Sequence, residues 1–242
     1  MRHMKCRAAL LLSLWCLMPS LRAVTVSVAD FMGVRETVIR GVGGEIMPNG
    51  ALVRLGYFNG YGTAWPEEAM HGILGGDPAV ARGFINIYFV PLGEGGPGRG
   101  TTSPTSRPTF RLRTVNGSPM PGRLAGSVSN VIPVSGPPNG EVSDGVPAGS
   151  RLFMIVGNGP TPELSTEFGI FSATTWLMPT LTTGAMVLNT VQVDSTEEVY
   201  RGLLSGSGNA FSLHLTPVIP EPGAAALALA AGTLLAGRRR LS

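Results

Sequence analysis

Short segments in which apolar and polar residues alternate recur along the middle of the chain. Residues 51–58, 110–113 and 211–216 show this alternation, which has the period of a β-strand that is buried on one face. Clusters of Gly, Pro, Ser, Thr and Asn separate these segments, and such clusters are typical of turns. The pattern predicts many short strands joined by turns.

Three further segments are almost continuously apolar. Residues 84–90 and 152–156 predict central strands that are covered on both faces, and residues 185–193 predict a longer strand. Together the segments predict about eight to ten strands in an antiparallel β-sandwich of the jelly-roll or Greek-key type. The fold class predicted for residues 24–219 is therefore all-β.

Helical signals are few and short. Residues 66–70 begin with a proline that two glutamates follow, which favours the first turn of a short helix. Ser195 and Glu198 have the spacing of a capping box and predict a turn through residues 199–204. The chain contains 34 Gly and 20 Pro residues, and both residue types disfavour longer helices.

Residues 1–23 have the three regions of a secretory signal peptide. Basic residues near the start precede an apolar run over residues 8–18, and a proline with small residues follows and ends at Ala23. The apolar run would span roughly 16 Å as a helix, which is short of the ~30 Å core of a bilayer. We expect cleavage after Ala23, with Ala29 as the alternative.

The C-terminal segment, residues 220–242, has a second three-part pattern. Its order is Pro220, Glu221 and Pro222, then a small and apolar run over residues 223–237, and then Arg238, Arg239 and Arg240. The run predicts a short transmembrane helix of about 22 Å. Arginines beside a membrane helix stay on the cytoplasmic side, so the body of the protein is expected on the other side.

This ending resembles the PEP-CTERM sorting signal of exported bacterial proteins, in which Pro-Glu-Pro, a transmembrane helix and a basic cluster stand in that order. The resemblance covers residues 220–240 and implies that the chain is the substrate of an exosortase, a membrane-embedded thiol-dependent protease or transpeptidase. It also implies a Gram-negative cell that makes extracellular polysaccharide. The expected partners are the secretion translocon, the exosortase-type enzyme and, through the C-terminal helix before processing, the membrane. A plain membrane anchor is the alternative.

The positive charge of the chain is concentrated at its ends. Seven of the 18 Lys and Arg residues lie in the two terminal segments, so eleven arginines face 15 acidic residues between Asp30 and Glu221, a net charge of −4. An acidic body does not attract phosphate backbones, so no nucleic-acid partner is expected. Lys5 is the single lysine of the chain, and the body therefore has no amine for Schiff-base chemistry.

The remaining inventory of reactive residues argues against catalysis and against cofactors. Cys6 and Cys16 lie in the predicted signal peptide, so the mature protein would have no thiol. His71 and His214 have no second ligand at metal-binding spacing, so no metal site is predicted. The Gly-x-Gly-x-x-Gly motif that starts at Gly93 continues into residues that cannot open a helix, so no nucleotide cofactor is expected.

Two adjacent acidic pairs, at residues 67–68 and 197–198, are more typical of helix caps than of the paired carboxylates of a glycosidase. We therefore expect a protein that is not an enzyme. A secreted enzyme that acts on polysaccharide is the third hypothesis.

Aromatic residues supply the remaining candidate binding site. Tyr57, Tyr61 and Trp65 lie within nine positions in a Gly-rich region, and Trp176 is a further candidate. Exposed rings of this kind bind sugars, so these four residues are speculative glycan contacts. The other interpretation is that they anchor loops on the core.

Taken together, these features predict an exported, non-catalytic protein of the cell surface or extracellular matrix. Its precursor would be anchored in the inner membrane, and processing would leave the mature form at the cell surface or outside the cell. The alternative is a carbohydrate-binding module that associates with extracellular polysaccharide.

Overall fold

The fold was obtained as a computed structural model. It describes residues 23–48, 51–93, 98–101, 109–110, 113–115, 118–120, 124–142, 144–159, 164–180, 184–207 and 209–218. The predicted signal peptide up to residue 22 and the predicted sorting signal at residues 220–242 lie outside the described residues. No helix within these ranges is long and apolar enough to cross a membrane.

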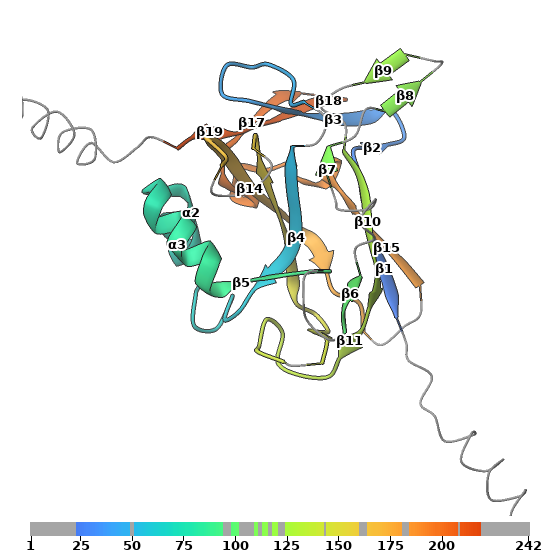
Figure 1. The fold of residues 1–242 in the computed structure, drawn as a ribbon, viewed down its shortest axis with the longest axis vertical. Helices are drawn as coiled ribbons and strands as arrows, with labels where there is room; N and C mark the ends of the chain where they lie inside the picture. The colour runs from blue at the N-terminus through green and yellow to red at the C-terminus, as the bar shows by residue number, and fades with distance from the viewer. Residues whose placement is uncertain are drawn as a thin grey trace, which may run out of the picture.

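A curved sheet dominates the described part of the chain (Figure 1). Eleven described strands form it, with β15-β1-β10-β7-β4-β13-β14-β16 as its path and with β5, β6 and β19 paired to members of that path. In chain order its strands are β1 (Val24–Ala29), β4 (Leu52–Phe58), β5 (Phe89–Pro91), β6 (Arg99–Thr101), β7 (Thr109–Phe110), β10 (Leu124–Val131), β13 (Arg151–Gly157), β14 (Glu167–Leu177), β15 (Gly184–Asn189), β16 (Val199–Arg201) and β19 (Thr216–Pro217).

A four-stranded sheet in the order β17-β18-β3-β2 lies at one end of this large sheet (Figure 1). Its strands are β2 (Phe31–Met32), β3 (Arg35–Arg40), β17 (Leu203–Ser207) and β18 (Ala210–His214). Two small pairs complete the described strands, namely β8 (Arg113–Val115) with β9 (Ser118–Met120) and β11 (Pro133–Val134) with β12 (Val146–Pro147).

Most strand pairs are antiparallel, which confirms the all-β prediction. Three described pairs are parallel, namely β1 with β15, β3 with β18, and β11 with β12. The first two of these pairs join the start of the described chain to its last third.

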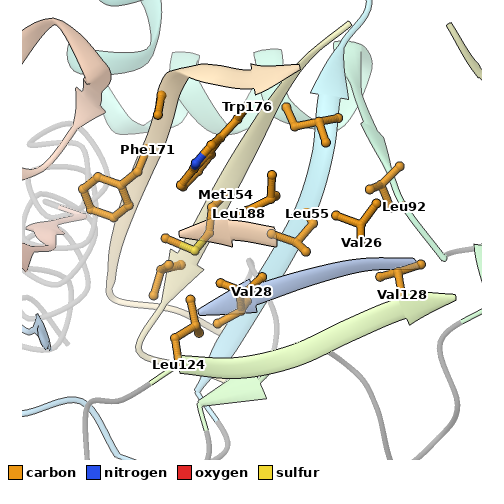
Figure 2. Close-up of a cluster of buried hydrophobic side chains, with 14 of the residues drawn as sticks. Val26, Val28, Leu55, Leu92, Leu124, Val128, Met154, Phe171, Trp176 and Leu188 are labelled. Atoms are coloured by element: carbon orange, nitrogen blue, oxygen red, sulfur yellow. The ribbon is translucent and has the colours of Figure 1, made fainter. Parts of the chain in front are cut away.

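The large sheet encloses the main hydrophobic core. Val26 and Val28 of β1, Leu55 of β4 and Met154 of β13 belong to this core, together with Trp176 of β14 (Figure 2). Side chains from both ends of the sheet path therefore meet in one cluster. This arrangement buries the continuous apolar run at residues 152–156, and every residue of β13 is buried, as the sequence predicts for a central strand.

Two helices cover the opposite face of β4, β13 and β14. They are α2 (Glu67–Gly75) and α3 (Pro78–Tyr88), and the short 3-10 helices η1 (Thr190–Gln192) and η2 (Thr196–Glu198) lie elsewhere in the chain. A second core lies between α2, α3 and the sheet. The predicted short helix after Trp65 is confirmed as α2 and extends to Gly75.

The predicted strand over residues 84–90 was wrong, because most of it belongs to α3. The Asp77 carboxylate accepts hydrogen bonds from the backbone N–H groups of Ala79 and Val80 at 2.7 and 3.2 Å, and Pro78 follows this cap. Both features start a helix. Within the helix Phe84 and Ile85 are buried whereas Ile87 is 73% exposed, so the apolar run has the period of a helix packed on one side.

Two other segments also form 3-10 turns where the sequence predicted a longer element. In the segment 185–193 the strand β15 ends at Asn189, whose side chain accepts from Val191 N and caps η1. At Ser195 the predicted capping box does not form, because the serine side chain makes no capping hydrogen bond. The 3-10 helix η2 is followed by strands β16 and β17 rather than by a continued turn.

We predict that Phe153→Ala lowers the free energy of unfolding by about 3–5 kcal/mol, because it empties the centre of the second core. The Phe153 ring is fully buried and contacts the rings of Phe58, Tyr61 and Tyr200 at centroid distances of 5.0, 5.2 and 5.1 Å. Urea unfolding measures the change. The matched control is Ile87→Ala on the exposed face of α3, which should change the free energy by at most about 0.5 kcal/mol; equal effects would contradict this description of the core.

Candidate functional site

A polar cluster lies where α2 meets the large sheet. We call Tyr61, Glu67, Arg151, Ser172 and Tyr200 the arginine–tyrosine cluster. Arg151 is the first residue of β13, Ser172 lies in the neighbouring strand β14, and Tyr200 lies in β16 beyond it. Tyr61 follows β4, and Glu67 is the first residue of α2. Four separate stretches of the chain, at residues 61–67, 151, 172 and 200, therefore contribute to one site.

Arg151 is the centre of this cluster. Its Nη1 donates to Tyr61 Oη at 2.7 Å and to Glu67 Oε1 at 2.8 Å. Its Nε donates to Ser172 Oγ at 3.0 Å, and Ser172 Oγ in turn donates to the backbone oxygen of Leu152 at 2.8 Å. The guanidinium also lies over the Tyr61 and Tyr200 rings, at 5.6 and 5.8 Å from their centroids. These contacts offset the cost of removing from water a cation that is only 7% exposed.

The Glu67 carboxylate is shared between the cation and the second tyrosine. Tyr200 Oη donates to Glu67 Oε1 at 2.8 Å and lies 3.1 Å from Tyr61 Oη. Burial acts to raise the pKa of Glu67, but the hydrogen bond from Tyr200 and the charge of Arg151 outweigh it, so the pKa is lowered. Burial raises the pKa of both tyrosines, and hydrogen bonding raises that of Tyr200 further.

These protonation states limit the chemistry of the cluster. At neutral pH Glu67 is a carboxylate, Arg151 is a cation and Tyr200 is a neutral hydrogen-bond donor. A tyrosine whose pKa is raised does not act as a base or a nucleophile near neutral pH. The cluster fastens the first turn of α2 to β13 and β16, and this structural role accounts for all the hydrogen bonds described above.

The two histidines of the described chain lie on separate elements. The ring of His71 in α2 stacks on Tyr200 with a centroid distance of 4.1 Å and an interplanar angle of 8°. His214 Nε2 in β18 lies 2.8 Å from Ser205 Oγ in β17. The strand paired with β18 on its other side places Arg40, not a carboxylate, opposite His214, so this serine–histidine contact has no orienting acid across the strand pair.

Metal ligands do not gather in the described part of the chain. Within it, no group of three or more His, Cys, Asp or Glu residues could hold a metal ion. In the second predicted acidic pair, residues 197–198, Glu198 is buried. Its carboxylate accepts hydrogen bonds from the backbone N–H groups of Thr174 at 2.9 Å and Asp194 at 3.0 Å. It therefore binds backbone donors of neighbouring segments.

The four predicted glycan contacts do not form an exposed platform. Tyr57 and Trp176 are 0% exposed and Tyr61 is 8% exposed, so their faces cannot receive a sugar and the prediction was wrong for these three residues. Trp65 is half-buried, and its ring packs on Phe84 at a centroid distance of 5.0 Å. The four rings belong to two different cores.

Of the residues in the two predicted terminal signals, the structure describes Ala23 alone. Ala23 is half-buried and directly precedes β1. The six predicted sorting-signal residues, Pro220, Glu221, Pro222, Arg238, Arg239 and Arg240, lie outside the described residues, as does the apolar run between them.

Sequence reasoning found Tyr61 and Glu67 but assigned them other roles, and it missed Arg151. A single arginine directly before the buried run at residues 152–156 was the available signal. A cation at the start of a strand that is covered on both faces needs a carboxylate and hydrogen-bond acceptors close by.

Comparison with known proteins identifies no family: no family model, curated protein or solved structure matches the chain significantly.

We predict that Tyr200→Phe lowers the free energy of unfolding by about 1–3 kcal/mol. The substitution keeps the ring on Phe153 but removes the hydroxyl that binds Glu67 and Tyr61. Urea unfolding at neutral pH measures the loss. Tyr88→Phe is the matched control, because the Tyr88 ring packs on Trp65 and Phe84 outside the cluster; an equal loss in both variants would contradict the role of the Tyr200 hydroxyl.

We further predict that Glu67→Gln weakens the loss of stability at acid pH. The folded protein lowers the pKa of Glu67 below its ordinary value of 4.5, so the carboxylate stabilises the fold above that value. This contribution is lost as the pH falls through the lowered pKa. Unfolding measured from neutral pH to below pH 4 should therefore have a smaller slope in the variant. The neighbouring Glu68→Gln is the control, and identical profiles for the two variants would refute the prediction.

Proposed function

We propose that this protein is an exported, non-catalytic component of the cell surface or extracellular matrix, and that a signal peptide and a C-terminal sorting signal direct it there. The observation that carries the proposal is the position of the outermost described strands. The first strand, β1, begins at Val24, directly after the expected cleavage position, and the last described strand, β19, ends at Pro217, three residues before Pro220.

The sheet favours Ala23 over Ala29 as the cleavage position. β1 lies between β10 and β15, and its residues Val24, Val26 and Val28 are buried in the main core. Cleavage after Ala29 would remove the whole strand and would leave β15 without its described neighbour. Cleavage after Ala23 keeps every residue of the sheet.

The last described strand supports the other half of the proposal. β19 pairs with β14, and Val218 N donates to Thr166 O at 2.7 Å. Pro220 follows two residues later, so a processing enzyme would meet the Pro-Glu-Pro motif close to the folded body. The jelly-roll or Greek-key assignment, the short transmembrane helix at residues 223–237 and the exosortase-type partner are parts of this proposal. Three of the four rings on which the carbohydrate-binding alternative was based, those of Tyr57, Tyr61 and Trp176, are buried.

We predict that alanines in place of Pro220, Glu221 and Pro222 block processing. The mass of the wild-type protein isolated from its own cells should correspond to a chain that begins at Val24 and lacks the C-terminal apolar run. The triple variant should keep the run and stay in the membrane fraction. Alanines at residues 160–162, which also form a Pro-x-Pro sequence, are the matched control and should leave processing unchanged. A wild-type mass that includes residues 223–242 would refute the sorting role.

A further inference from the structure

The four-stranded sheet has one face in the main core and one face turned outward. Ile39 of β3 and Leu213 of β18 are buried in the core. Side chains alternate between the two faces of a strand, so the even-numbered residues of β3 and β18 lie on the outward face. Ser205 of β17 lies on this face too, because it pairs with Ser212. We call the four half-buried polar side chains there the polar patch, namely Arg40, Ser205, Ser212 and His214.

Hydrogen bonds fix both basic side chains of the polar patch. Arg40 Nε donates to Ser212 Oγ at 3.2 Å, and Arg40 Nη1 donates to Gly44 O at 2.8 Å. His214 Nε2 lies 2.8 Å from Ser205 Oγ. Each basic group is therefore held by a serine of the neighbouring strand. Arg40 Nη2 makes no hydrogen bond with a described residue and is not fully buried.

The two basic groups lie side by side without a carboxylate between them. The parallel pairing of β3 and β18 places Arg40 directly beside His214, on strands about 5 Å apart. On the other side of His214, β17 places Leu203, which is 57% exposed. Within the described chain no carboxylate forms an ion pair or a hydrogen bond with either basic group. Arg40 is therefore the charged group that the two flanking strands place opposite His214.

The acidic residues nearest to the polar patch lie outside it. Glu36 shares the outward face of β3, but four residues of extended strand, about 13 Å, separate it from Arg40. Glu45 and Glu167 lie near the loop that follows β3 and make no ion pair with Arg40. Like charges directly opposite each other destabilise a sheet. An anion between Arg40 and a protonated His214 would relieve this repulsion.

We propose that the polar patch binds an oxyanion between Arg40 and His214. The guanidinium donates strong, directional hydrogen bonds to carboxylate and phosphate-like oxygens. The Ser212 hydroxyl, which accepts from Arg40 Nε, still has its own proton to donate. A histidine gains its positive charge as the pH falls from about 8 to about 5, so binding strengthens over this range.

The carboxylate of an acidic sugar and a free sulfate ion share this chemistry, and both keep their charge over the same pH range. The site consists of described residues of the body alone. It does not depend on the proposed function, and a failure of the sorting signal would leave it unchanged.

Titration of the full-length chain, purified in a neutral detergent, tests the site. Sodium sulfate and sodium glucuronate are the two probes, and sodium chloride keeps the ionic strength constant. The NMR signals of the histidine rings, assigned with His71→Gln and His214→Gln, are the readout. We expect the His214 signals to shift to saturation, with a dissociation constant several-fold lower at about pH 5.5 than at about pH 8. The ring of His71, which stacks on Tyr200, is the internal control, and its signals should not move.

Two arginine variants locate the bound anion. Arg40→Gln should weaken binding by about tenfold or more, because it removes the charged donor. Arg35→Gln is the matched control. Arg35 lies on the same strand but over the Phe211 ring, at 5.0 Å, on the face opposite the polar patch. This variant should bind both probes as the wild type does, and equal losses in the two variants would overturn the proposal.

The wild-type titration decides the proposal even if Arg40→Gln does not fold. Saturation by both probes identifies a site for oxyanions in general, saturation by glucuronate alone identifies a carboxylate site, and saturation by sulfate alone identifies a site for a tetrahedral anion. His214 signals that reach saturation with neither probe would overturn the proposal, as would equal dissociation constants at the two pH values.

Discussion

The burial of β13 on both faces is the constraint on which the rest of this structure depends. One face of the strand supplies Leu152, Met154 and Val156 to the main core, and the other supplies Phe153 and Ile155 to the core under the helices. A strand with no exposed residue needs a layer on each side. The curved sheet forms the first layer, and α2 and α3 form the second. The arginine–tyrosine cluster closes the edge of that second layer.

Much of the fold follows from the sequence where the local pattern and the tertiary environment agree. β13 and β4 were predicted because their apolar residues have the spacing of buried strands. α3 was not, because a run that includes Phe84, Ile85, Ile87 and Tyr88 looks alike in a buried strand and in a helix. The deciding signal was the Asp77-Pro78 start of the helix, outside the apolar run.

The site was harder to predict than the fold, because its members come from distant segments. Arg151 and Glu67 are 84 positions apart, and only the packing of α2 on β13 and β16 brings them together. The same packing explains why aromatic residues at positions 57–65 do not form a surface platform: one face of β4 points into the main core and the loop after it lies under α2. Spacing in the sequence shows that rings are near each other, but it does not show which side of the sheet they occupy.

The parallel pairs β1–β15 and β3–β18 have a consequence for the order of assembly. The register joins Val24 to Gly184 and Glu36 to Ala210, so neither of these N-terminal strands can gain its parallel neighbour until most of the body has been synthesised. Contacts between such distant segments slow folding, because a long loop must close before they form. β1 can pair with β10 and β3 with β2 before then, but both sheets gain their parallel strand pairs only when the last third of the chain is present.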